Sequence, residues 1–82
     1  SALLGLLGEV SAALYAEGEP QVQVNQLDYS AVRGDLSLQL QAPGFAELEG
    51  LRERLQQAGL SVQMGSASRE AQGVSARVVI GG

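Results

Sequence analysis

The sequence predicts a small α+β domain, a two-layer sandwich in which two helices cover one four-stranded antiparallel sheet. Two observations predict it. The hydrophobic period changes between helical and alternating along the chain, and the segments follow the order helix, strand, strand, helix, strand, strand. The length of 82 residues allows one hydrophobic core and no second one. We therefore expect residues 1–82 to form a single domain.

The first predicted element is an amphipathic helix over residues 1–16. Ser1 is a candidate N-cap, and Gly18 followed by Pro20 provides the stop signal. The run is shorter than the about 20 apolar residues that a bilayer-spanning helix needs. Apolar residues recur at helical spacing and form one stripe: Leu3, Leu7, Val10 and Leu14.

Residues 21–41 have the pattern of a β-hairpin. The alternation changes parity near Asn25 and Gln26, which predicts a β-bulge or a bend in the first strand. The turn is expected at residues 30–35, and we interpret its Arg-Gly-Asp triplet as turn sequence, because three residues recur often by chance. Apolar and polar residues alternate strictly over residues 36–41, which predicts a strand with one buried face and one solvent-exposed face.

The second half of the chain repeats this order. A helix is expected from Phe45 to Leu55, opened by the preceding Pro-Gly pair and stopped by Gly59. Residues 60–64 alternate as a third strand, and the polar stretch 65–73 is expected to be a connection. Residues 74–80 alternate again and form the predicted fourth strand.

The polarity of the four strands predicts their order in the sheet. The second and fourth strands have the cleanest apolar alternation and should lie in the centre of the sheet. The first and third strands are richer in glutamine and serine and are interrupted, so they should lie at its edges. The resulting order is 3-4-2-1, a circularly permuted ferredoxin-like sheet, with the first helix over strands one and two. The expected core is Leu7, Val10, Leu14, Leu36, Leu38, Leu40, Phe45, Leu48, Leu51, Leu55, Val62, Val78 and Ile80.

The composition argues against catalysis and against cofactor or metal binding. The chain has no cysteine, histidine or lysine, so the usual nucleophile–base pairs and metal ligands are missing. Nine acidic residues against five arginines give a net charge of −4, which disfavours nucleic acid. Asp28 and Asp35 alone are a poor calcium site, and no helix follows the glycine–serine stretch 65–68 to make it a phosphate loop. We expect no catalytic, cofactor or metal residues.

Several modest motifs resemble one known family. They are the segment FAELEGLRERL at 45–55, the stretch 59–62 after it, residues 27–36 before it and GVSARVVI at 73–80. In their order and spacing the chain resembles the C-terminal periplasmic domain of the L protein of the bacterial type II secretion system. The resemblance covers nearly the whole chain.

The resemblance implies a fold, a location and a set of partners. Such proteins have a cytoplasmic part that engages the secretion ATPase, one transmembrane helix and a periplasmic domain with the permuted ferredoxin-like fold. That domain pairs with itself as a homodimer and with the M protein, which helps to couple the ATPase to pseudopilus assembly. The family implies no catalytic residues here. The chain would be an excised periplasmic fragment of an inner-membrane protein.

We expect the partner interface on the first helix and the adjoining first strand. The apolar stripe leaves over residues of the helix that would otherwise face water: Leu4, Leu6, Gly8, Ala12 and Ala13. The predicted edge strand nearby, with Val22 and Val24, offers unpaired backbone groups that a partner could use. The alternative is that the extra leucines are scattered surface residues or pack on an upstream linker.

Three other functions stay open at this stage. A ferredoxin-like domain can sense small molecules between paired sheets, although Gly65 and Gly73 are weak hints of such a pocket. The chain could also be the M-type or pilus-alignment counterpart. An acylphosphatase-like enzyme is the third reading, and the sequence offers no positively charged phosphate cradle for it.

Overall fold

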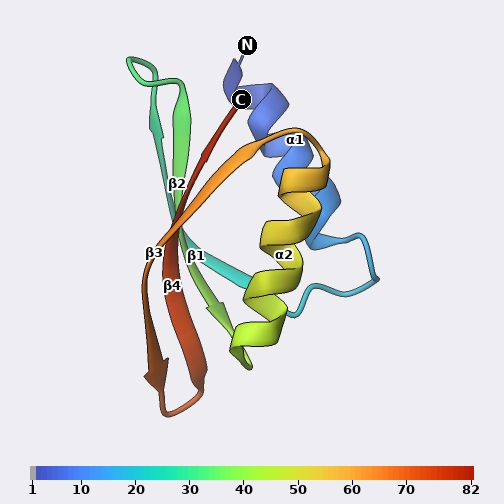
Figure 1. Cartoon of the computed structure of the whole chain (residues 1–82), viewed down its shortest axis with the longest axis vertical. Helices are drawn as coiled ribbons and strands as arrows, with labels where there is room; N and C mark the ends of the chain where they lie inside the picture. Colours follow the sequence, from blue (N-terminus) through green and yellow to red (C-terminus); the bar gives the residue numbers. More distant parts are fainter. Residues whose placement is uncertain (1) are drawn as a thin grey trace.

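The computed structural model describes residues 2–82 as two helices and one antiparallel sheet (Figure 1). The elements are α1 (Ala2–Leu14), β1 (Gln23–Ser30), β2 (Asp35–Ala42), α2 (Phe45–Gln57), β3 (Ser61–Glu70) and β4 (Gly73–Gly81). Ser1, the expected N-cap, lies outside the described residues. Within residues 2–82, no helix is long and apolar enough to cross a membrane.

The strand order β1-β2-β4-β3 confirms the predicted sheet, with the two most apolar strands in the centre. Both helices lie on the same face of the sheet in Figure 1. Alternate residues of the central strands are buried on that face, and every one of them is at most 3% exposed: Leu36, Leu38, Leu40, Ala42, Val74, Ala76, Val78 and Ile80. The other face, which the helices leave open, carries mostly polar side chains, among them the buried Ser37.

The two helices divide the covered face between them. On one side of α2, the ring of Phe45 contacts Arg69 of β3. On the other side, Arg54 donates a hydrogen bond from Nε to the carbonyl oxygen of Ala13 in α1, at 2.8 Å. Because α2 has β3 on one flank and α1 on the other, α1 lies over the half of the sheet that contains β1 and β2.

Each edge strand contains a β-bulge. In β1 the register with β2 shifts between Val24 and Gln26, which confirms the bulge predicted from the change of parity. In β3 the register with β4 shifts between Met64 and Ala67, and this bulge was not predicted. Bulges twist a strand and interrupt its ladder, which suits an edge position.

β3 is longer than expected, and the prediction of a polar connection over residues 65–73 is wrong. Residues 67–70 pair with β4, and the hairpin turn lies at residues 71–72. The small polar residues of this stretch resemble a loop in sequence. They form a strand because the backbone groups on the outer side of β4 need hydrogen-bond partners next to Val74 and Ala76.

The turn into β4 requires the glycine at position 73. Gly73 has a φ of +127°, which side chains of L-residues rarely adopt. A Cβ atom there would lie 2.2 Å from the carbonyl oxygen of Ala42 and 3.2 Å from Cα of Pro43. The end of β2 therefore packs directly on the backbone of this turn.

The core differs from the prediction at several positions. Phe45 is 41% exposed, because it begins α2 at the rim of the sheet, so its assignment to the core is wrong. Leu7, Leu14 and Val62 are only half-buried and pack against the core from its edges. Six residues missing from the predicted core belong to it: Leu6, Ala13, Val22, Ala42, Val74 and Ala76.

Candidate interaction surface

The buried face of α1 is rotated from the predicted stripe. Leu6, Val10 and Ala13 are the buried residues of this helix, whereas Leu3 and Leu7 are half-buried. A helix that packs on a sheet alone needs one narrow stripe, but the buried residues of α1 belong to the core formed with the sheet, and α1 also contacts α2. Its buried face therefore turns toward the angle between those two elements.

Three predicted interface residues are buried within the domain itself. Leu6 is 5% exposed, Ala13 is 7% exposed and Val22 is 6% exposed, so the expectation that Leu6 and Ala13 face water is wrong. The side chain of Ala13 belongs to the core, and its backbone carbonyl oxygen accepts the hydrogen bond from Arg54 of α2. Close approach at this position serves the packing of the two helices.

The other predicted interface residues do reach the surface. Leu4 is 69% exposed, Gly8 and Ala12 are exposed, and Val24 is half-buried at the edge of the sheet. Exposure makes these four residues available to a partner, and their role as an interface stays a prediction.

Leu27 is an exposed apolar residue that the sequence reasoning placed on β1 and not at the interface. It pairs with Leu38, which is 1% exposed beneath the helices, so Leu27 also points to the helix-covered face. Because β1 is the edge strand, the helices do not cover it fully, and Leu27 remains 45% exposed. The parity change at the bulge was the signal that could have identified it, since it moves Leu27 and Tyr29 to the apolar face.

Two sets of residues together are called the α1/β1 surface here: Leu4, Gly8 and Ala12 on the outer side of α1, and Val24 and Leu27 on the edge strand β1. It carries little charge, because Glu9 is the one charged residue of α1 and Asp28 the one charged residue of β1 among the described positions. Asp28 pairs in register with Ser37 and so belongs to the open face of the sheet. An apolar, weakly charged edge of this kind is suited to protein contact.

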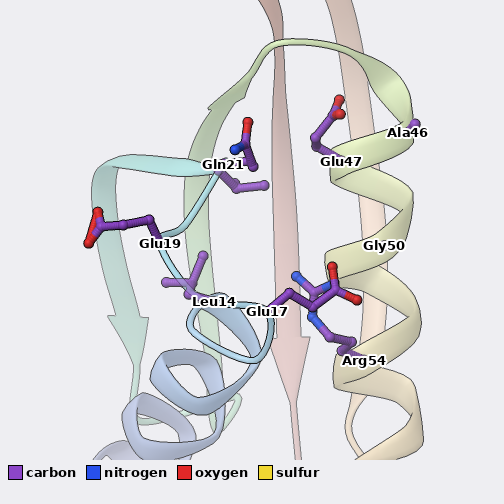
Figure 2. A pocket seen from close by; sticks show the side chains of 9 residues that line it. Leu14, Glu17, Glu19, Gln21, Ala46, Glu47, Gly50 and Arg54 are labelled. Carbon is purple, nitrogen blue, oxygen red and sulfur yellow. The ribbon is translucent and has the colours of Figure 1, made fainter.

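A cavity of about 350 Å³ lies between the α1–β1 connection and α2 (Figure 2). Its lining combines an apolar floor with charged side chains: Leu14, Glu17, Glu19, Gln21, Val22, Ala46, Glu47, Gly50 and Arg54. Arg54 Nη1 lies 3.9 Å from Glu17 Oε1, while the carboxylate of Glu19 points away from both in Figure 2.

This cavity offers no evident catalytic chemistry. It contains neither a serine nor a tyrosine, and the chain has no cysteine, histidine or lysine to serve as nucleophile or base. Among residues 2–82, no group of three or more acidic side chains is arranged to hold a metal ion. Arg54 is held by its bonds to Ala13 and Glu17, so its evident role is to tie α1 to α2.

The clearest electrostatic interaction lies elsewhere on α2. Arg52 donates a hydrogen bond from Nε to Glu49 Oε2 at 2.9 Å, and a second one to Gln56 at 2.8 Å. The hydrogen bond from Arg52 lowers the pKa of Glu49 below its ordinary value, although partial desolvation acts in the opposite direction. Both groups face solvent, so this pair orders the helix surface and does not activate a group for chemistry.

Comparison with known proteins gives these surfaces a context. Residues 2–82 match the family model described as the GspL periplasmic domain. The chain belongs to the GspL periplasmic domain family. It is 62% identical over 80 residues to the type II secretion system protein L of Pseudomonas aeruginosa, covering 98% of this chain and 20% of that protein. The domain thus corresponds to about a fifth of its relative's length.

Two solved structures share the fold. The periplasmic domain of XcpY superimposes with a TM-score of 0.86 at 58% identity, covering 96% of this chain and 99% of that one. The periplasmic domain of EpsL from Vibrio parahaemolyticus superimposes with a TM-score of 0.79 at 22% identity, covering 98% and 93%. The second likeness concerns the fold alone. These matches confirm the family suggested by the sequence motifs and place the domain in the periplasm.

Proposed function

We propose that this domain is a non-catalytic assembly module of the type II secretion inner-membrane platform. The observation that carries the proposal is an apolar, nearly uncharged α1/β1 surface on a domain of the GspL periplasmic family. The chain has no cysteine, histidine or lysine, and residues 2–82 hold no cluster of three acidic side chains for a metal, whereas a free edge strand and exposed leucines suit protein association.

The partners that we propose are a second copy of the domain and the M protein of the same system. Residues 1–82 would act as the periplasmic domain of a longer protein whose other parts anchor it in the inner membrane and reach the secretion ATPase. Association through the α1/β1 surface would then help to couple the ATPase to pseudopilus assembly. Leu27 and Leu4 would supply the apolar contact, and the outer edge of β1 would supply free backbone groups.

The experiment compares charge insertions on and off this surface. Leu27→Arg and Leu4→Arg place a charge on it, and Val32→Arg is the matched control because Val32 is 99% exposed at the tip of the β1–β2 hairpin. Each variant is measured by sedimentation velocity over a range of concentrations, alone and mixed with the M protein's periplasmic domain. Circular dichroism verifies that each one is folded.

We expect the parent and Val32→Arg to associate alike and Leu27→Arg to associate more weakly with both partners. Leu4→Arg should have the same direction of effect. The proposal is wrong if both leucine variants are folded and associate as the parent does. Leu6→Arg is unsuitable as a test, because Leu6 is buried and a charge there would unfold the domain.

A further inference from the structure

β3 presents the second free edge of the sheet, opposite the α1/β1 surface. It is ten residues long, and only Val62 and Met64 among them are half-buried, the rest being exposed. Of the features that commonly protect edge strands, β3 lacks lysine, proline and short length but has a β-bulge and the charged residues Arg69 and Glu70. Its single interruption is the bulge, which leaves Ala67–Glu70 as a regular free segment.

The helix-covered side of this segment carries an aromatic ring and a cation. Arg69 pairs in register with the buried Val74, so its side chain lies on the side of the helices. Its guanidinium carbon is 5.3 Å from the centroid of the Phe45 ring, a distance at which cation–π attraction operates. The ring itself stays 41% exposed beside the free edge.

The guanidinium of Arg69 has no carboxylate partner among residues 2–82. The ion pairs of the described chain belong to Arg33, Arg52 and Arg54 instead. The contact with the Phe45 ring limits the motion of the guanidinium, and no carboxylate of the described residues occupies its N–H donors. A planar guanidinium held in this way can bind a carboxylate through two parallel hydrogen bonds.

We propose that the β3 edge binds an extended, acidic segment of a partner protein. Its backbone pairs with Ala67–Glu70, one aspartate or glutamate side chain meets Arg69, and an apolar side chain two residues away rests against Phe45. Residues two apart in a strand point to the same face, about 6.6 Å from each other, so both contacts lie on the helix-covered side. This site is separate from the α1/β1 surface, and neither depends on the other.

The test uses two blocked seven-residue peptides as probes. Both have the sequence Ser-Val-Ser-X-Ser-Val-Ser, so a valine lies two residues from the central position X on either side. X is glutamate in one peptide and lysine in the other. Binding is followed through the backbone amide resonances of the ¹⁵N-labelled domain. We expect shifts along β3 and an affinity for the glutamate peptide that is about five-fold higher than for the lysine peptide.

Three variants connect the effect to its residues. Arg69→Gln should abolish the preference for glutamate, and Phe45→Ala should weaken the binding of both peptides. Arg77→Gln is the control, because Arg77 pairs with Gln39 on the opposite face of the sheet and should leave the preference intact. The proposal fails if the peptides shift the amide resonances of β1 instead of β3, or of neither strand. It also fails if the parent domain binds both peptides with equal affinity, or if Arg77→Gln removes the preference for glutamate.

Discussion

The close contact at Gly73 can be tested by adding a single methyl group. In Gly73→Ala, the new Cβ would lie 2.2 Å from the Ala42 carbonyl oxygen, so backbone atoms and not a flexible side chain would have to move. The φ of +127° adds backbone strain of about 1–3 kcal/mol. Overpacking of this kind adds about 1–3 kcal/mol more, while a domain of this size has only about 5 kcal/mol of stability to lose.

Two other glycines separate the contributions to this loss. Gly59→Ala meets the same kind of strain, because its φ is +90°, but a Cβ there has no neighbour within 4 Å. Gly5→Ala lies in α1 with open space around it and should stabilise the domain by about 0.5–1 kcal/mol. Urea unfolding followed by far-ultraviolet circular dichroism ranks the three variants. Equal losses for Gly73→Ala and Gly59→Ala would refute the argument from close contact.

Three further predictions concern packing, helix contact and titration. Leu38→Ala should lower the free energy of unfolding in urea by about 2–5 kcal/mol, because Leu38 is 1% exposed. Phe45→Ala should lower it clearly less, because Phe45 is 41% exposed. The reverse ranking would contradict the core assignment. Arg54→Met should lower the free energy of unfolding by about 1–2 kcal/mol and speed amide hydrogen exchange in α1, because the charge-assisted hydrogen bond between the helices is lost. Unchanged exchange would contradict the role of Arg54 in holding α1 to α2. Arg52→Gln should raise the pKa of Glu49 toward its ordinary value in a carboxyl ¹³C titration. The pKa of Glu49 is lower in the folded domain than in the unfolded chain, so its pair with Arg52 stabilises the domain at pH values above the unfolded pKa of about 4.3. This stabilisation is lost as the pH falls through the folded pKa.

The fold could be predicted because the polarity of each strand records its place in the sheet. β2 and β4 are buried on one face along their whole length, which only central positions allow. The extent of β3 could not be predicted in the same way. Its second half has the small polar residues of a loop, and it forms a strand because β4 offers a row of backbone partners.

The candidate surface was only partly predictable, because helix patterning does not fix how far a helix is rotated. Leu6 and Leu7 are adjacent apolar residues, and either could have faced the core. The structure buries Leu6, together with Ala13, whose carbonyl oxygen is bonded to Arg54 of α2. The exposure of Leu27 follows from an edge that the helices leave uncovered, which depends on the packing of three elements at once.

The bulges in the two outer strands also bear on how the domain behaves at high local concentration. They divide each exposed rim into short pieces, of which residues 26–30 in β1 and residues 61–64 and 67–70 in β3 keep a regular register. Fibril-forming stacks need uninterrupted segments of about six or seven residues. Neither rim offers one, so the bulges protect the domain against edge-to-edge stacking of copies into an ordered aggregate.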